Sequence, residues 1–215
     1  MDALSTTLMV LDYAAVAVFG ATGALAAARR KHDIITFGFF AAVTGVGGGT
    51  LRDLLIGAPV FWVAKPQYVA VCVAAAAAIW VFGWGRRGER MLNWLDALGM
   101  AAYCVVGALK SLSMGVPPLS AIVMGVLTAA FGGIIRDVLA EEPSILLKRE
   151  LYITPALLGA GAFVGLDAMG VAATVAGVVG FLCAFALRAG AMLFGWRMPG
   201  FPGRTPPDAP PPERP

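Results

Sequence analysis

The sequence carries one motif twice, and the two copies belong to a longer match that covers most of the chain. The first copy, GGTLRD, occupies residues 48–53, and the second, GGIIRD, occupies residues 132–137. They lie 84 residues apart, and the same separation, without a gap, relates Asp12 to Asp96, Thr44 to Thr128, Pro59 to Pro143 and Tyr68 to Tyr152. The chain therefore repeats one structural unit, and its fold has to be built from two similar halves.

The apolar composition indicates a membrane protein. Of the 215 residues, 59% are hydrophobic and 13% are charged, and the mean hydropathy is +0.81. A water-soluble domain cannot bury that much apolar surface within itself, so we expect an integral membrane protein with an all-α fold. The net charge of +3 is small, and it does not indicate a nucleic-acid partner.

The apolar segments predict seven transmembrane helices. A spanning helix needs roughly 20 mostly apolar residues. Such segments lie near residues 9–28, 34–51, 67–84, 93–112, 118–135, 151–166 and 171–194. We expect residues 1–84 and 93–166 to form two three-helix repeats, with a seventh helix at 171–194. The remaining residues, 195–215, include eight prolines from residue 199 onward and are expected to form a disordered cytoplasmic tail.

The positions of Lys and Arg predict the orientation in the membrane. If the N-terminus is outside, thirteen of these residues lie on one side, and only Arg52, Lys65 and Lys110 lie on the other. The positive-inside rule makes the richer side cytoplasmic, so we expect a multi-pass protein of the cell inner membrane with a cytoplasmic C-terminus. Because each copy has three spans, an odd number, the second copy enters the membrane from the opposite side. The copies are therefore expected to be inverted repeats.

Glycines cluster inside the second and fifth predicted spans. Each weakens a helix by about 1 kcal/mol relative to Ala, so we expect these helices to break or kink there. Backbone freed in this way is tolerated at membrane depth where protein buries it or water reaches it. Close helix packing through small residues is the alternative, and the glycines alone leave it open. The candidate pore kinks are Gly45, Gly47, Gly48, Gly49, Gly132 and Gly133.

Each glycine run ends in a charge pair, Arg52-Asp53 in the first copy and Arg136-Asp137 in the second. An Arg at the centre of a spanning helix costs at least roughly 2.5 kcal/mol in lipid, so both must face protein, water or an interface. One interpretation is a structural clamp within each pair. Adjacent helical residues do not face each other, however, so each Arg can instead bind the facing repeat or helix-terminal carbonyls. The functional interpretation is that the pairs flank a polar path and set its electrostatics.

Lys110 breaks the symmetry of the duplication, because the first copy has Ala26 at the matching position. The Lys110 side chain can snorkel to the outer interface, or it can act as a pore-lining or gating charge that responds to the membrane potential. Asp12 and Asp96 are expected to cap the spans that they begin.

The sequence contains no His-Glu-x-x-His, Cys-x-x-Cys, P-loop or nucleophile-elbow pattern. This argues against the common intramembrane hydrolases and against ATP-driven transport. We therefore expect a protein that is not an enzyme, with no cofactor and no metal site.

The doubled Gly-Gly-x-x-Arg-Asp motif, each copy followed six residues later by a proline (Pro59 and Pro143), resembles the prokaryotic trimeric intracellular cation (TRIC) channel family. The resemblance covers residues 9–194. It implies a homotrimer in which each subunit has its own pathway, with potassium as the main permeant ion. It also implies that the glycine-interrupted second and fifth helices line this pathway, with the two Arg-Asp pairs around it.

The resemblance also bears on regulation and on the alternative function. Animal members carry a Lys-Glu-Val motif on the fourth helix, whose Lys is tied to lipid binding and gating. The nearest equivalent here is Lys110-Ser111-Leu112, which lacks the acidic residue. Membrane lipids remain expected partners, whereas phosphoinositide regulation of the animal kind is not expected. Domains of this family are also described as glycine transporters, so a secondary transporter of a small neutral solute such as glycine is the alternative.

Overall fold

The structure is a computed structural model that describes residues 3–83, 88–145 and 151–199. Within these ranges the chain forms eight helices: α1 (Ala3–Arg29), α2 (Ile34–Leu55), α3 (Phe61–Ala64), α4 (Gln67–Phe82), α5 (Gly88–Ser113), α6 (Pro118–Leu139), α7 (Ile153–Ala168) and α8 (Ala173–Phe194). The Pro-rich tail predicted from the sequence lies, from residue 200 onward, outside the described residues.

The predicted spans correspond to seven of these helices, and the sequence missed the four-residue helix α3. By length and composition, α2, α5, α6 and α8 are apolar enough to cross a membrane, and α4 and α7 are shorter apolar helices of 16 residues each. Local signals explain where the long helices begin. The Asp33 carboxylate caps α2 by accepting hydrogen bonds from the backbone N–H groups of Ile35 and Thr36, and Pro118 opens α6.

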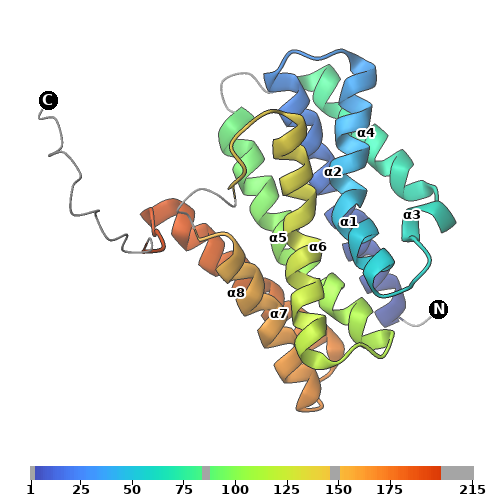
Figure 1. The fold of residues 1–215 in the computed structure, drawn as a ribbon, viewed down its shortest axis with the longest axis vertical. Coiled ribbons are helices and arrows are strands. Elements are labelled where there is room, and N and C mark those ends of the chain that lie inside the picture. Colours follow the sequence, from blue (N-terminus) through green and yellow to red (C-terminus); the bar gives the residue numbers. More distant parts are fainter. Residues whose placement is uncertain (1–2, 84–87, 146–150, 200–215) are drawn as a thin grey trace, which may run out of the picture.

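The helices pack in an order that repeats within the chain. Helix α1 packs against α2 and α4, and in the same way α5 packs against α6 and α7. Helices α1 and α5 contact each other, as do α2 and α6. Figure 1 shows α1 rising from the N-terminus while α5 descends beside it, so these two helices are antiparallel. We call α1, α2 and α4 the first copy, and α5, α6 and α7 the second.

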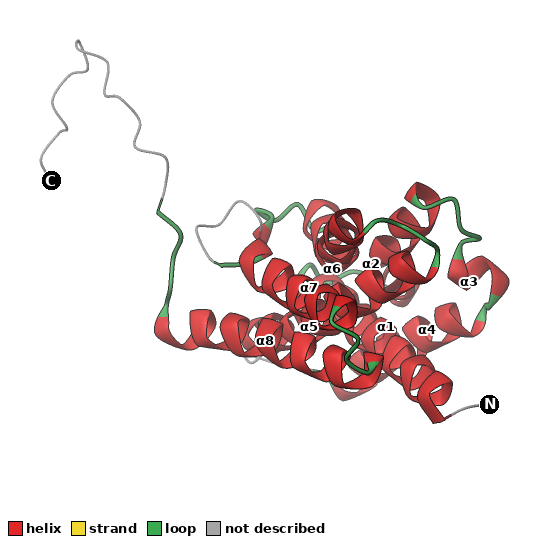
Figure 2. Cartoon of the chain, turned by 90° about the horizontal axis from the view of Figure 1, so that it is seen from below, coloured by secondary structure: helices red, strands yellow, loops and turns green. Residues whose placement is uncertain are grey.

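Helix α8 lies outside both copies and packs on α5 and α7. In the view from below (Figure 2), α8, α5, α1 and α4 lie side by side in one row, with α6 and α2 next to each other across it. Phe19 of α1 and Tyr103 of α5, which are equivalent residues, stack on each other with ring centroids 5.2 Å apart at the contact between the copies. At this central contact, a residue of the first copy therefore packs on the equivalent residue of the second.

The equivalence extends to the backbone of the loops. Lys31, after α1, has a φ of 55°, and its counterpart Gly115, after α5, has a φ of 79°. Gly57, after α2, and Glu141, after α6, match in the same way, with φ values of 67° and 51°. The left-handed conformation suits glycine and strains other residues. Equivalent positions in the loops of the two copies therefore share the left-handed conformation, although only one residue of each pair is a glycine.

Helices α2 and α6 are continuous through their glycine runs. The break that the sequence predicted there is therefore wrong. The glycine backbone keeps its helical hydrogen bonding because each run packs against a neighbouring helix, which compensates for the low helix propensity of glycine.

Candidate functional site

The two glycine-rich helices cross where their glycines remove all side-chain bulk. A Cβ added at Gly48 of α2 would overlap the carbonyl oxygen of Thr128 in α6. A Cβ at Gly132 of α6 would lie 2.6 Å from the carbonyl oxygen of Thr44 in α2, which is the equivalent contact. Both glycines are buried. The glycines therefore act here as small-residue packing positions that bring two helix backbones together.

The remaining candidate glycines surround this crossing. The carbonyl oxygen of Gly45 accepts a hydrogen bond of 3.1 Å from the Tyr103 hydroxyl. A Cβ at Gly47 would meet the side chain of Ile135 in α6, and one at Gly49 would meet the Phe61 ring. The crossing thus joins α2 to α3, α5 and α6.

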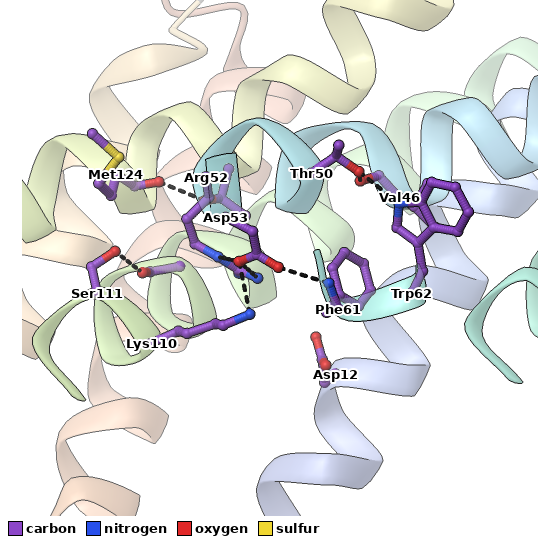
Figure 3. A network of polar contacts seen from close by, with 12 residues as sticks. Asp12, Val46, Thr50, Arg52, Asp53, Phe61, Trp62, Lys110, Ser111 and Met124 are labelled. Carbon is purple, nitrogen blue, oxygen red and sulfur yellow. Dashed lines mark hydrogen bonds and ion pairs between the residues drawn. The ribbon is translucent and has the colours of Figure 1, made fainter. Parts of the chain in front are cut away.

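The first charged cluster lies at the end of α2 and is shown in Figure 3. It is centred on Asp53, which is fully buried. Its Oδ1 atom accepts hydrogen bonds from Nε and NH2 of Arg52, at 2.9 and 2.8 Å, and from Nζ of Lys110 in α5, at 2.7 Å. Its Oδ2 atom accepts the backbone N–H of Phe61 at 2.9 Å. Asp53 therefore joins α2, α3 and α5 at one point.

Aromatic rings complete this cluster. The Phe61 ring lies below the guanidinium of Arg52 and the ammonium of Lys110, at 5.9 and 5.8 Å from its centroid, within the range of cation–π attraction. Beside it, Asp12 of α1 accepts a hydrogen bond of 2.5 Å from the Tyr68 hydroxyl of α4. The first charged cluster thus comprises Asp12, Arg52, Asp53, Tyr68 and Lys110.

The second charged cluster repeats this arrangement with Asp96, Arg136, Asp137 and Tyr152. Nε and NH2 of Arg136 donate to Oδ1 of Asp137 at 2.9 and 2.8 Å, and the backbone N–H of Ile145 donates to its Oδ2 at 2.9 Å. In addition, NH1 of Arg136 donates to Oδ1 of Asp96 in α5 at 2.7 Å. Two buried carboxylates here share one guanidinium whose side chain is 2% exposed.

Arg188 connects α8 to the second charged cluster. Its guanidinium stacks 5.3 Å from the centroid of the Tyr152 ring, and NH1 donates to the carbonyl oxygen of Leu151 at 2.9 Å. Arg188 is buried, so a long cation of the last helix reaches the interior of the bundle. Helix α8 packs on α5 and α7, which both belong to the second copy.

The structure shows which groups the charged motif residues bind. Arg52 and Arg136 each pair with the neighbouring Asp, as in the clamp interpretation, and Arg136 also binds Asp96 of α5. Lys110 reaches from α5 to the first charged cluster. Its side chain is only 29% exposed, and its ammonium binds the buried Asp53 carboxylate.

The predicted capping role of Asp12 and Asp96 is wrong. Helices α1 and α5 begin at Ala3 and Gly88, well before these residues, so both carboxylates lie within helices. They bind Tyr68 and Arg136 instead. Asp12 and Asp96 therefore belong to the charged clusters.

The sequence interpretation also left out the tyrosines and Arg188. Tyr68 and Tyr152 are related by the separation of 84 residues, so the duplication marked them without indicating a role. Arg188 was counted only as a cytoplasmic charge. Its position inside the predicted apolar segment 171–194 was the available signal, because a charge within a span is expected to face the protein interior.

Comparisons with known proteins place this geometry in a family. The family model described as "Glycine transporter" matches residues 9–84 and again residues 93–168. A UPF0126 membrane protein of Vibrio cholerae is 37% identical over 205 residues, covering 93% of this chain and 85% of the relative. The UPF0126 inner membrane protein YadS of Escherichia coli is 38% identical over 154 residues, covering 69% of this chain and 73% of the relative.

A solved structure agrees with these matches. The trimeric intracellular cation (TRIC) channel orthologue from Rhodobacter sphaeroides is 47% identical, with a TM-score of 0.86, and the match covers 89% of this chain and all of that one. The relatives are named membrane proteins, in keeping with the apolar helices of this chain. The chain therefore belongs to the family that the glycine-transporter model describes, together with the UPF0126 membrane proteins and the prokaryotic TRIC channels.

Proposed function

We propose that the protein is a monovalent cation channel, permeable to potassium, with one pathway in each subunit of a homotrimer. The observation that carries this proposal is the 47% identity and the TM-score of 0.86 to a protein named as a trimeric intracellular cation channel, which the match covers completely. Because both fold and sequence are shared over nearly the whole subunit, the proposal transfers an activity of the entire chain rather than of one motif.

The proposed pathway is bounded by α1, α2, α5 and α6. These four helices carry the buried carboxylates and guanidinium groups of both charged clusters. Ionisable groups within spanning segments are costly and typically mark ion pathways. Gly45, Gly47, Gly48, Gly49, Gly132 and Gly133 line the crossing between the clusters. Since that crossing is packed in this structure, we propose that conduction requires α2 and α6 to separate there.

We also propose the membrane orientation. Seven helices span the membrane, the N-terminus is outside, the C-terminus is cytoplasmic, and the two copies are inverted repeats. Two contacts support this arrangement, because they bring loops of the predicted cytoplasmic side together. Arg29 forms an ion pair of 3.2 Å with Glu142, and NH2 of Arg30 donates to the carbonyl oxygen of Glu141 at 2.9 Å.

Reconstitution into a planar bilayer tests the channel function. Purified protein with potassium on both sides is expected to give discrete single-channel currents, whereas empty bilayers under the same voltages stay silent. Crosslinking in membranes is expected to end at a trimer. Repeated absence of unitary currents from folded protein, or crosslinking that ends at a dimer, would contradict the corresponding part of the proposal.

A secondary transporter of a small neutral solute such as glycine is the second candidate, and the description of the family model favours it. A carrier saturates and can accumulate its solute against a gradient, while a channel only dissipates gradients. Uptake of labelled glycine into proteoliposomes distinguishes the two. Saturable accumulation without unitary currents would replace the channel proposal.

A further inference from the structure

The first charged cluster uses only one of two possible partners for its helix-α1 carboxylate. The Tyr68 hydroxyl donates to Oδ2 of Asp12 at 2.5 Å. NH1 of Arg52 is buried and has no hydrogen-bond partner among the described residues. Arg52 is the counterpart of Arg136, which binds the equivalent aspartate in the second copy. In the first copy, therefore, the aspartate is bound to tyrosine and not to arginine.

The second charged cluster shows the opposite choice. NH1 of Arg136 donates to Oδ1 of Asp96 at 2.7 Å. The Tyr152 hydroxyl and Oδ2 of Asp96 are both buried without a partner in the described part of the chain. A Cβ built at Gly133 would lie 3.0 Å from the Tyr152 hydroxyl and 3.3 Å from Oδ1 of Asp96, so both groups border the same small space. Here the aspartate is bound to arginine and not to tyrosine.

The same residues thus adopt two hydrogen-bonding states within one molecule. Each copy makes the bond that the other lacks, and each leaves buried polar atoms unsatisfied in consequence. A buried polar group without a partner is destabilising. In each copy, the unsatisfied atoms therefore favour a change to the bond seen in the other copy. Because the Asp, Tyr and Arg of the two copies match in sequence and their helices pack in matching pairs, the state seen in one is structurally accessible to the other.

We infer that Asp12 and Asp96 are positioning residues that exchange between the tyrosine and the arginine of their own copy, and that the exchange of Asp96 from Arg136 to Tyr152 opens the pathway. This inference rests on the proposed function. The arginine bond ties the first helix of a copy to its second, here α5 to α6, across the boundary of the pathway. The tyrosine bond ties the first helix to the segment that begins the third, and it does not involve the second.

Two residues outside the repeated set explain why the copies differ. Lys110 contributes an additional donor to Asp53 in the first charged cluster. The residue that matches Lys110 in the duplication is Ala26, whose side chain has no donor to offer. Arg188 of α8 stacks on the Tyr152 ring in the second cluster, and no helix corresponds to α8 in the first copy. These two cations break the equivalence of the clusters. In the resulting resting state Asp12 is bound to Tyr68 and not to Arg52, whereas Asp96 is bound to Arg136.

Tyr152→Phe is the decisive variant, because it removes a hydroxyl that bonds to no described residue in the resting state. If that hydroxyl only fills space, its loss leaves gating unchanged. If it receives Asp96 on opening, open probability in planar bilayers falls at least about tenfold, the factor that one hydrogen bond to a charged group supplies. Tyr13→Phe is the control. Tyr13 stacks on Tyr68 with centroids 4.2 Å apart and belongs to neither exchanging pair.

Thermal unfolding of the purified full-length protein provides a test that does not depend on conduction. Tyr68→Phe removes a bond that exists at rest and is expected to lower the melting temperature. Tyr152→Phe removes an unsatisfied hydroxyl and is expected to leave the melting temperature unchanged or to raise it. A double-mutant cycle of Tyr68→Phe with Asp12→Asn should show coupling, and the matched cycle of Tyr152→Phe with Asp96→Asn should show none.

The two measurements separate failure of the inference from failure of the proposed function. If the wild type conducts but Tyr152→Phe gates like the wild type, the exchange is overturned. Equal loss of stability in Tyr68→Phe and Tyr152→Phe would also overturn it, since the two tyrosines would then be bound alike at rest. If the wild type does not conduct, the proposed function fails, while the stability comparison still tests whether the two copies occupy different states.

Discussion

Gly48 of α2 lies directly against the main-chain carbonyl of Thr128 in α6, with no space for a methyl group between them. We therefore predict that Gly48→Ala pushes the two helices apart and lowers the free energy of unfolding by about 1–3 kcal/mol, the usual cost of overpacking. Thermal unfolding and size-exclusion profiles in detergent measure the loss.

Gly38→Ala is the matched control for this substitution. Gly38 lies in the same helix, and a Cβ at this position has no neighbour within 4 Å. Alanine is the better helix former by about 1 kcal/mol, so this variant should be as stable as the wild type or more stable. If both variants lose stability equally, the crossing at Gly48 is not the cause.

Lys110→Ala should raise open probability or shift its voltage dependence while the protein still assembles. The ammonium of Lys110 is a fixed positive charge beside the proposed path, and it raises the energy of a passing cation. Planar-bilayer recordings measure the effect. Lys65→Ala removes an exposed cation on the same predicted side and serves as the control. An unchanged current–voltage relation in Lys110→Ala would exclude a gating role for this charge.

Arg136→Ala should destabilise the protein more than Arg52→Ala does. Loss of Arg136 leaves Asp96 and Asp137 buried without their common cation, and breaking a buried pair costs about 3–5 kcal/mol. After loss of Arg52, Lys110 still neutralises Asp53. Size-exclusion profiles and unfolding midpoints of the two variants, compared side by side, provide the measurement. Equal losses would mean that Lys110 does not compensate for Arg52.

The helix cap at Asp33 should make the stability of the folded protein depend on pH in the acid range. The backbone N–H of Thr36, the Thr36 hydroxyl and the backbone N–H of Ile35 bind its carboxylate, and they lower its pKa below the ordinary value of 3.8. A lowered folded-state pKa means that the stabilisation is complete above pH 3.8 and is lost as pH falls through the lower, folded-state value. Asn at this position also caps a helix but does not titrate.

Asp33→Asn should therefore unfold with a weaker dependence on pH in the acid range below 3.8 than the wild type, and behave like it near neutral pH. Thermal unfolding followed by circular dichroism across that range tests this. Parallel pH curves for the two proteins would show that the Asp33 cap does not contribute to stability.

Cysteine labelling tests the proposed orientation. In a background with Ala at positions 72, 104 and 183, Thr205→Cys should react with a membrane-impermeant maleimide only after the membrane is opened. Labelling of intact cells would contradict a cytoplasmic C-terminus, and the inverted arrangement of the copies with it. A cysteine in place of Ser113, at the end of α5, is the opposite control because it is expected to face outside.

Much of the fold was predictable because hydropathy and duplication act over long stretches. The predicted segments 34–51 and 118–135 begin at the same residues as α2 and α6, where Asp33 and Pro118 give clear start signals. Helix α3 was missed because it is a single turn between two prolines, too short for any periodicity to show. The tertiary contacts of the glycines were also hidden, so propensity favoured a break that packing prevents.

The sequence indicated several residues that form the site, but not which of them bind one another. The duplication selected Arg52, Arg136 and their neighbouring aspartates, and all four lie in the charged clusters. Which carboxylate binds which donor depends on distances between helices, and those distances are not encoded in spacing along the chain. The different partners of Asp12 and Asp96 are therefore a property of the assembled bundle, and a repeat of identical residues gives no hint of them.

The left-handed corners at Lys31 and Glu141 offer a route to thermostabilised variants. Their counterparts, Gly115 and Gly57, show that glycine fits the same conformation, so Lys31→Gly and Glu141→Gly should relieve about 1 kcal/mol of backbone strain each. Part of this gain is offset because glycine makes the unfolded chain more flexible. Neither residue belongs to the charged clusters. Such variants should therefore increase the stability of the protein during purification without altering the clusters.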